Sequence, residues 1–124
     1  MKQIEVVAAV IHRKDEYLAV ERGYGEFQGK WEFPGGKIEA GEHREEALLR
    51  EIKEELEADI EIEKFLCTVE YSYETFHLIM HCYLCSVEED ALVYHEHSAH
   101  RWVRKEQFDS VDWLPADIEV LSYL

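Results

Sequence analysis

The hydrophobic and polar positions divide the chain into strand-like segments and one long helical segment. The run VVAAVI at Val6–Ile11 is apolar throughout, which is typical of a central strand buried on both faces of a sheet. Ile60–Tyr73 and Thr75–Val87 alternate between apolar and polar residues, so we expect two long strands joined by a hairpin near Glu74. Shorter strands are predicted at Tyr17–Val20, Trp31–Phe33 and Ala99–Val103.

The strongest helical pattern covers Glu42–Leu56. Apolar residues three and four positions apart predict its buried stripe, which comprises Leu48, Leu49, Ile52 and Leu56. Acidic residues suit the positive end of the helix dipole in the first turn, where Glu42, Glu45 and Glu46 occur. A second helix is predicted at Pro115–Leu124, because proline favours the first helical position.

Polar and glycine-rich segments separate these elements. Turns or loops are predicted at His12–Glu16, between Gly23 and Lys30, and at Glu88–Asp90, and Lys105–Phe108 is predicted as a helical turn. The resulting order is β-β-β-α-β-β-β-α. We therefore expect one domain over residues 1–124, of the α/β (α+β) class, with a mixed sheet that carries helices on its faces.

Composition and charge restrict the possible partners. The 124 residues are 47% hydrophobic and 33% charged, which is typical of a folded domain. A net charge of −15 repels a nucleic-acid polymer, and no apolar stretch approaches the roughly 20 residues that span a bilayer. The first apolar run is too short for a signal peptide. We expect a cytoplasmic protein without membrane or nucleic-acid polymer partners, whose polyanionic substrate would need a bridging divalent cation.

The three cysteines are predicted to be buried free thiols. Their odd number argues against a disulfide framework. Cys82 and Cys85 form a C-x-x-C motif, but they lie in the apolar run FHLIMHCYLCSV, which is predicted to be a strand. Residues three apart on a strand face opposite sides of the sheet, so a zinc or redox pair is not expected, and Cys67 has no pairing motif.

Three glutamates converge on one side of the predicted helix. Glu51, Glu54 and Glu55 are three and four positions apart, and Arg50 precedes Glu54 by four residues. Mutual repulsion destabilises such a cluster unless a cation offsets it, and oxygen ligands suit Mg²⁺ or Mn²⁺. Considered alone, the cluster is equally compatible with an exposed, solvated helix face.

The spacing of the charged residues resembles a known motif. The segment GKIEAGEHREEALLREIKEELEA, starting at Gly36, resembles the Nudix box G-x5-E-x7-R-E-U-x-E-E-x-G-U, in which U is apolar. The segments IEVVAAVI, WEFPGGKIEAGE and LPADIEVL also look like MutT-type nucleoside triphosphate pyrophosphohydrolases, above all the branch acting on CTP and dCTP. The resemblance implies an α/β/α sandwich that converts a nucleoside triphosphate and water to the monophosphate and pyrophosphate with Mg²⁺ or Mn²⁺.

The resemblance also implies roles for single residues. Glu51, Glu54 and Glu55 match the metal ligands, and the Gly35 carbonyl would complete the inner shell. Arg50 would hold the glutamates in place, and Glu42 would have a structural or outer-shell role. Glu96 matches a loop glutamate that reaches the metals, so either Glu51 or Glu96 is the general base. The alternatives are that Glu96 is an ordinary loop acid, or that His95 and His97 form a zinc pair.

Recognition of the substrate is assigned to four further residues. Arg22 is expected to contact phosphate, and Phe33 and Tyr73 are expected to flank the base unless they belong to the core. An ionised Asp117 can only accept hydrogen bonds, which suits the N4 amino group of cytosine. MutT-type enzymes acting on 8-oxo-dGTP have asparagine there. Alternatively, Asp117 caps the last helix or accepts from a purine amino group.

Other functions stay open within and outside this class. The alternatives are an 8-oxo-dGTP diphosphatase, a hydrolase of other nucleoside diphosphate derivatives, a non-catalytic nucleotide-binding module and a structural scaffold. The protein would be a monomer or a homodimer. The sequence differs from the Nudix box at one position, where Glu57 replaces the last glycine. Glu57 either adopts the left-handed conformation that glycine favours, or the helix ends differently, near Asp59.

Overall fold

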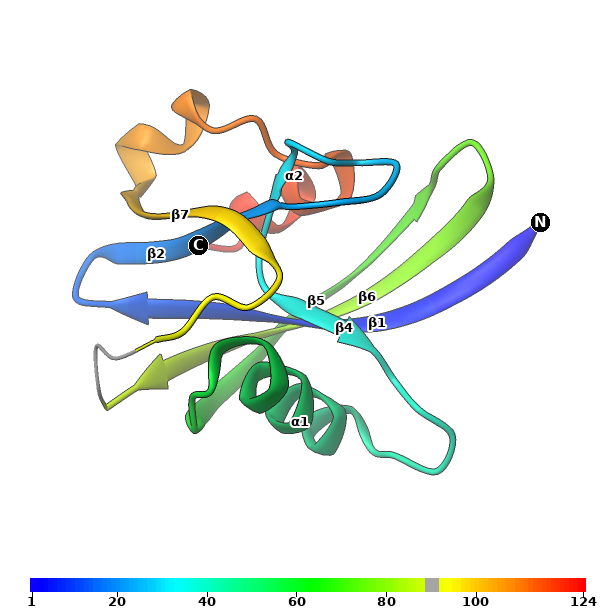
Figure 1. Ribbon diagram of the computed structural model, residues 1–124, viewed down its shortest axis with the longest axis horizontal. Helices are drawn as coiled ribbons and strands as arrows, with labels where there is room; N and C mark the ends of the chain where they lie inside the picture. Colours follow the sequence, from blue (N-terminus) through cyan, green and yellow to red (C-terminus); the bar gives the residue numbers. More distant parts are fainter. Residues whose placement is uncertain (89–91) are drawn as a thin grey trace.

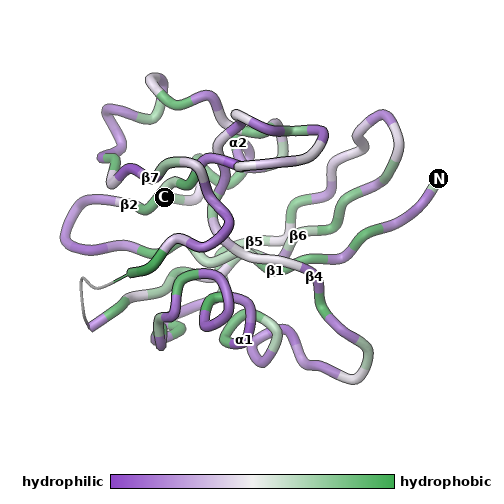
Figure 2. The backbone as a smooth tube through the Cα atoms, in the orientation of Figure 1, coloured by the Kyte–Doolittle hydropathy of each residue, from purple (hydrophilic) through white to green (hydrophobic). Residues whose placement is uncertain are grey.

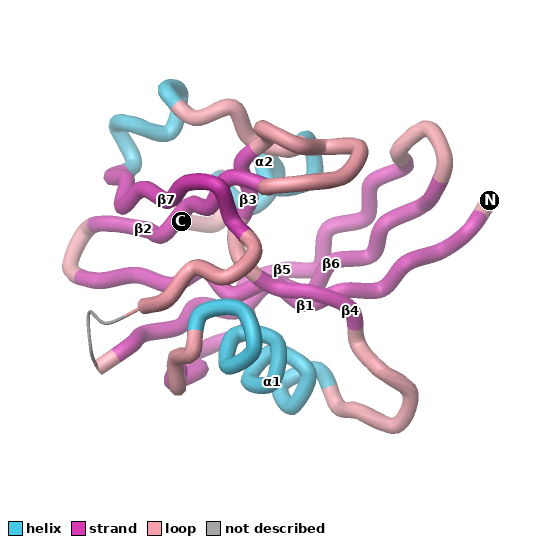
Figure 3. Tube along the Cα trace, in the orientation of Figure 1, coloured by secondary structure: helices cyan, strands magenta, loops and turns pink. Residues whose placement is uncertain are grey.

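The computed structural model describes residues 1–88 and 92–124. Of the loop predicted at Glu88–Asp90, only Glu88 is among the described residues, and the rest of the loop lies outside them. The chain forms, in order, β1 (Lys2–Arg13), β2 (Glu16–Arg22), β3 (Trp31–Glu32), β4 (Gly35–Lys37), α1 (Arg44–Leu56), β5 (Ile60–Ser72), β6 (Phe76–Val87), β7 (His97–Arg104), the 3₁₀ helix η1 (Lys105–Ser110) and α2 (Pro115–Leu121) (Figures 1 and 3).

Along one of its edges, the central strand β1 pairs with two different strands. On one side it pairs in parallel with β6, from Lys2 to His12. On the other side it pairs with β2 only at His12 and Arg13, and β4 takes this place at Val6–Ala8. The freed strand β2 pairs with β3 and β7 instead. The sheet is mixed, as predicted, and its two parts diverge where β2 leaves β1 (Figure 1).

Two hydrophobic clusters lie on opposite faces of the sheet. Val7, Ala9 and Ile11 of β1 pack with α1, whereas Ala8 and Val10 pack with residues of α2. The continuous apolar run is therefore buried on both faces, as predicted. The two helices cover different faces of the sheet, and the central parts of β1 and β6 are hydrophobic (Figures 1 and 2). This is the α/β/α sandwich that the resemblance implied.

The buried cysteines confirm this alternation. All three are free and buried. Cys67 and Cys82 belong to the cluster that includes α2, whereas Cys85 belongs to the cluster that includes α1. Cys82 and Cys85 therefore face opposite sides of the sheet, as the period of a strand requires.

Several boundaries differ from the sequence prediction. Helix α1 begins at Arg44 rather than Glu42, with His43 as its N-cap, because the His43 N–H donates to the Glu46 carboxylate at 2.9 Å. Helix α2 ends at Leu121. Leu49 was assigned to the buried stripe, but it is 44% exposed, and the fully buried Ala47 faces the core instead. In the part of the chain that the structure describes, no helix is long and apolar enough to cross a bilayer.

Strand β4 is absent from the sequence prediction, which ends the preceding strand at Phe33. Its pairing with β1 depends on an unusually close approach. A Cβ atom on Gly35 would lie 2.0 Å from the carbonyl oxygen of Val7, which no side chain can tolerate. The glycine that signals a turn in the sequence thus serves here as a strand residue that packs on backbone.

The substitution Gly35→Ala is expected to destabilise the fold. The added methyl group would clash with the backbone of β1, so β4 must move, and we expect a loss of about 1–3 kcal/mol in the free energy of unfolding. Urea denaturation measures this loss. The exposed Lys37 of the same strand provides a control, because Lys37→Ala should change stability by less than about 0.5 kcal/mol. Equal stability of the two variants would contradict the role assigned to Gly35.

Candidate active site

A cavity of about 610 Å³ gathers residues from segments far apart in the sequence. Glu51 and Glu55 of α1 line it together with Gly35 of β4 and Glu96, which precedes β7. The same cavity contains a second group, which includes all four residues assigned to substrate recognition: Arg22, Phe33, Tyr73 and Asp117. The fold thus brings the predicted carboxylates and the predicted substrate-binding residues to one place.

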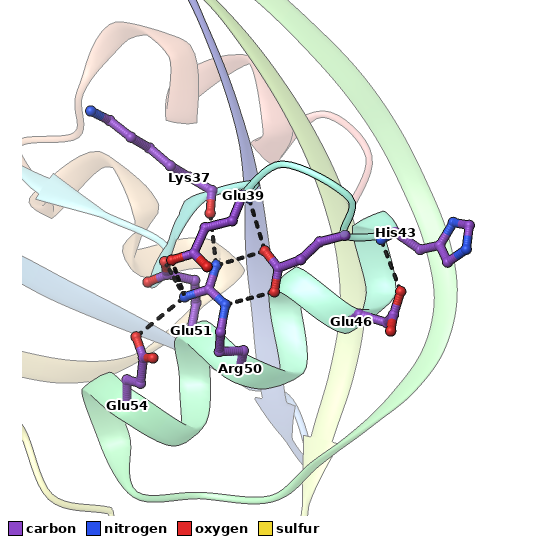
Figure 4. Close-up of polar contacts among 8 residues, drawn as sticks. Lys37, Glu39, His43, Glu46, Arg50, Glu51 and Glu54 are labelled. Atoms are coloured by element: carbon purple, nitrogen blue, oxygen red, sulfur yellow. Dashed lines mark hydrogen bonds and ion pairs between the residues drawn. The ribbon is translucent and has the colours of Figure 1, made fainter.

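Arg50 organises the carboxylates of α1 and of the preceding loop. Its guanidinium donates two hydrogen bonds to Glu42, at 2.7 and 2.9 Å, and a third to Glu51 at 3.0 Å. It also contacts Glu54 at 3.3 Å and the Lys37 carbonyl at 3.0 Å (Figure 4). The predicted pairing of Arg50 with Glu54 is present, and the guanidinium also ties α1 to β4.

These contacts shift the pKa values of the partners. The hydrogen bond with Arg50 lowers the pKa of Glu42 to about 2, helped by the backbone hydrogen bond with Glu39. Hydrogen bonding to Glu42 in turn raises the pKa of Arg50, so the guanidinium stays charged. Glu42 precedes α1 and does not line the main cavity, and it therefore acts as an anchor for Arg50.

Glu55 presents the clearest sign of a missing positive partner. Burial, together with the charges of Glu51 and Glu96, raises the pKa of its carboxyl from an ordinary 4.5 to about 8. Its Oε2 atom is buried without any hydrogen-bond partner. Burial likewise raises the pKa of Glu51, against the influence of Arg50. A divalent cation fits this donor set, because it would supply charge to buried oxygen atoms that the protein leaves unpaired.

Gly36 shapes the space beside these carboxylates. A Cβ atom on Gly36 would lie 2.3 Å from the Glu51 carboxylate carbon, so any side chain would displace this group. The two glycines therefore have different tasks: Gly35 allows β4 to reach β1, and Gly36 leaves room for Glu51.

Glu54 differs from the other two helix glutamates. Its side chain is 61% exposed, bonds to Arg50, and does not line the cavity. Within residues 1–88 and 92–124, no three His, Cys, Asp or Glu side chains are grouped tightly enough to hold an ion as they stand. The structure thus places Glu51 and Glu55 in the cavity, whereas Glu54 lies outside it and bonds to Arg50.

The segment before β7 brings Glu96 to the cavity. Glu96 is exposed, and its charge acts on both Glu51 and Glu55. The neighbouring histidines have separate surroundings. His95 bonds to Glu57, whereas His97 lines the cavity and has a buried Nδ1 atom without a hydrogen-bond partner. Burial lowers the pKa of His97, which therefore favours the neutral form.

Asp117 is the most buried acid in the cavity, at 3% exposure. Its Oδ1 atom accepts the Phe33 N–H at 2.9 Å, and so the carboxyl joins the last helix to the segment after β3. Burial raises its pKa well above the ordinary value, while the Phe33 hydrogen bond opposes this shift. An ionised, acceptor-only Asp117 is expected from the sequence, whereas burial shifts the group toward the protonated form, which both donates and accepts.

The aromatic residues divide between core and cavity. Phe33 is almost completely buried and packs on Trp113, with ring centroids 4.8 Å apart, although it borders the cavity. Tyr73 stacks on Phe76 with centroids 5.1 Å apart, and its hydroxyl accepts the Ala116 N–H at 3.2 Å. Tyr73 is therefore the better placed of the two predicted aromatic residues to contact a bound base.

Sequence reasoning missed several residues of this cavity. Glu32 binds Arg22 through two hydrogen bonds, at 2.8 and 2.9 Å, and its charge also acts on Asp117. Phe27 lies beside Tyr73, with centroids 5.1 Å apart, although its segment reads as a plain glycine-rich loop. In the segment WEF, a strand places Glu32 on the opposite side from Trp31 and Phe33, and this alternation could have indicated a separate role for Glu32. No local pattern marks Phe27 or Phe76.

A cavity with buried carboxylates beside an apolar, aromatic region is typical of an enzyme active site, and its oxygen ligands suit a divalent metal ion. Comparison with known proteins agrees. The NUDIX domain model matches residues 1–124. The CTP pyrophosphohydrolase of Escherichia coli K12 is 36% identical over 125 residues, which covers 98% of this chain and 91% of the relative.

Two further comparisons extend this result. A putative 8-oxo-dGTP diphosphatase of Mycobacterium tuberculosis is 32% identical over 121 residues, covering 94% of this chain and 84% of the relative. The crystal structure of the MutT protein from Methanosarcina mazei has a TM-score of 0.86 at 26% identity, covering 98% of this chain and 91% of that one. The chain therefore belongs to the Nudix family, as a MutT-type hydrolase acting on nucleoside triphosphates. Nudix hydrolases generally need divalent metal ions, usually Mg²⁺.

The raised pKa of Glu55 predicts a pH dependence of stability in the metal-free protein. Between about pH 4.5 and 8 the folded state keeps the Glu55 proton and the unfolded chain releases it, so the free energy of unfolding should fall as pH rises. Urea denaturation in the presence of a chelator should show this fall, and Glu55→Gln should flatten it. Excess Mg²⁺ should offset the fall in the wild type only. Identical slopes for the wild type and Glu55→Gln would contradict the burial of this carboxyl.

Proposed function

We propose that this chain hydrolyses CTP and dCTP, including 5-methylated forms, to the monophosphate and pyrophosphate with Mg²⁺, which Mn²⁺ can replace. The observation that carries the proposal is the position of Asp117, buried in the same cavity as Glu51 and Glu55. The similarity to a relative named as a CTP pyrophosphohydrolase supports the same substrate class.

The carboxylates would hold the metal ion. Glu51, Glu55, Glu96 and the Gly35 carbonyl are the groups at the cavity, with Glu54 at its margin. When bound, Mg²⁺ neutralises phosphate oxygens and lowers the pKa of a bound water. Arg50 keeps Glu51 oriented by the 3.0 Å hydrogen bond and keeps α1 fixed to the preceding loop through Glu42. Arg22, which Glu32 holds charged, is expected to contact the phosphates.

A general base must remove a proton from the attacking water. Glu51 and Glu96 are the two candidates. Burial raises the pKa of Glu51, which brings it nearer to the working pH and makes it a stronger base once ionised. Glu96 is exposed and comes from a different segment, so it can approach the substrate from another direction.

Asp117 is proposed to read the base. Cytosine presents an N4 amino donor beside the N3 acceptor. An ionised Asp117 accepts from N4, and a protonated Asp117 can in addition donate to N3, so both states are compatible with cytosine. Tyr73 would stack against the base, as aromatic side chains do against heterocycles.

A second candidate is the hydrolysis of 8-oxo-dGTP. The 32% identical relative carries that name as a putative activity. A protonated Asp117 both donates and accepts, which a purine edge also satisfies. The two candidates share the metal site and the reaction, and they differ only in the base that Asp117 and the aromatic residues recognise.

A pyrophosphate-release panel with Mg²⁺ tests the substrate. The panel contains the eight common NTPs and dNTPs, 5-methyl-dCTP and 8-oxo-dGTP, compared by kcat/KM. We expect cytosine nucleotides to be preferred, and Asp117→Ala, which removes both the donor and the acceptor, to reduce this preference by about 10- to 100-fold, the effect of one good base contact. A preference for 8-oxo-dGTP, or an unchanged preference in Asp117→Ala, would contradict the proposed reading of the base.

Two conservative variants test the general base. Glu51→Gln and Glu96→Gln keep the size of the side chain but remove its basic carboxylate. We expect at least one of these variants to lower kcat by about 10²- to 10⁴-fold. Glu45→Gln is the matched control on α1, because Glu45 lies outside the main cavity, and it should keep wild-type turnover. Near-wild-type turnover in both Glu51→Gln and Glu96→Gln would show that neither residue is the base.

A further inference from the structure

Glu57 occupies a backbone position that is unfavourable for its residue type. It follows the last residue of α1 with φ 52° and ψ 36°, in the left-handed region, and its N–H donates to the Lys53 carbonyl. Among residues 1–88 and 92–124, Lys14 is the only other residue besides glycine with positive φ. The Nudix box has glycine at the position of Glu57, and glycine adopts this conformation freely. Glu57 therefore has a side chain at a position where the Nudix box has none.

The Glu57 side chain reaches the segment that precedes β7. Its Oε2 atom lies 2.5 Å from Nε2 of His95, although 38 residues separate the two in sequence. Both side chains are about half exposed, at 54% and 47%. An exposed pair of this kind contributes little to stability, less than the left-handed backbone costs. Its effect is therefore on the position of the segment that His95 belongs to.

The same segment is bonded to the end of α1 through its backbone. The Val93 N–H donates to the Leu56 carbonyl at 3.0 Å, and the His95 N–H donates to the Glu55 carbonyl at 3.3 Å. These carbonyls belong to the last turn of the helix, where they have no partner within the helix. The segment thus docks on α1 at two backbone positions, and the Glu57 side chain adds a third contact.

Glu96 follows directly after this docked segment. Its own carbonyl oxygen lies against Gly23, where a Cβ atom would be only 2.8 Å away. The backbone of Glu96 is therefore confined between the end of α1 and the glycine after β2. Glu96 lines the same cavity as Glu51 and Glu55, and its charge acts on both of them. His95, the residue directly before Glu96, is the one that the Glu57 side chain contacts.

We propose that Glu57 is a positioning residue, which holds His95 and thereby places Glu96 opposite Glu51 and Glu55. The inference rests on the proposed role of Glu96 at the metal site. In this arrangement Glu57, which stands where the Nudix box has glycine, lacks the conformational freedom of glycine. Its side chain instead holds the segment that leads to Glu96.

Amide hydrogen exchange of the metal-free protein tests the tether directly. Glu57→Gly removes the carboxylate and fits the left-handed backbone, and it should speed exchange of the Val93 and His95 amides about threefold to fivefold, the effect that one exposed pair supports. Lys14→Gly is the matched control, because it makes the same change at the other left-handed residue, away from the cavity. It should leave these amides unchanged. Equal exchange in the wild type and Glu57→Gly would overturn the proposal.

Turnover with Mg²⁺ provides the second readout. Glu57→Gly should lower kcat about threefold to fivefold with KM unchanged, while its melting temperature stays at or above that of the wild type. Glu57→Gln can still bond to His95 and should restore most of the lost kcat. His95→Ala should reproduce the loss, and the double variant should lose no more than either single one. Unchanged kcat in Glu57→Gly would overturn the effect of the tether on catalysis.

The variant Glu96→Gln separates the two proposals. If Glu96→Gln keeps wild-type turnover while Glu57→Gly speeds exchange, the tether stands as a structural contact, and its proposed effect on catalysis is overturned together with the role of Glu96. If Glu96→Gln loses turnover and Glu57→Gly changes neither exchange nor kcat, the role of Glu96 stands and the positioning role of Glu57 is overturned.

Discussion

The close approach of β4 to its neighbours is the constraint on which the site depends. Gly35 lies so near the backbone of β1 that a methyl group would be 2.0 Å from the Val7 carbonyl oxygen, and Gly36 leaves the space in which the Glu51 carboxylate lies. This approach lets β4 replace β2 beside β1, and the divergence of β2 sends Arg22 and the segment around Glu96 to the other part of the sheet. A side chain at either glycine would clash, at Gly35 with the backbone of β1 and at Gly36 with the carboxylate of Glu51, which lines the cavity.

The site concentrates negative charge in a protein that is already acidic. Arg50 is the cation that bonds to the α1 carboxylates, and its bonds to Glu42, Glu51 and Glu54 use much of its donor capacity. Glu55 receives no such bond and keeps a raised pKa and an unpaired buried oxygen. The protein thus stabilises part of the cluster by itself and leaves Glu55 and Glu51 partly uncompensated. This arrangement suits the divalent cations that Nudix hydrolases generally need, because only an added charge can make it favourable to ionise every carboxylate.

The last helix connects substrate recognition to the fold. Asp117 bonds to the Phe33 backbone, and Tyr73 accepts the Ala116 N–H, so the residues proposed to contact the base also fix α2 in place. Glu57 combines two tasks in a similar way, since it ends α1 and contacts the segment before Glu96. Its left-handed backbone costs about 1–2 kcal/mol for a residue other than glycine, which places it among the strained positions that occur near functional sites.

The sequence alone determined the elements with strong periodicity and the carboxylates with fixed spacing. The apolar run of β1, the long strands β5 and β6, and the shared side of Glu51 and Glu55 on α1 follow from local patterns, because strand and helix periods fix which side chains share a face. Local patterns could not reveal β4, the exposure of Leu49, the pairing of Arg22 with Glu32, or the protonation tendency of Asp117. Each of these depends on what lies opposite the residue in space. Burial, pKa and the close approach of two backbones are properties of contacts between distant segments, and only the tertiary structure decided them.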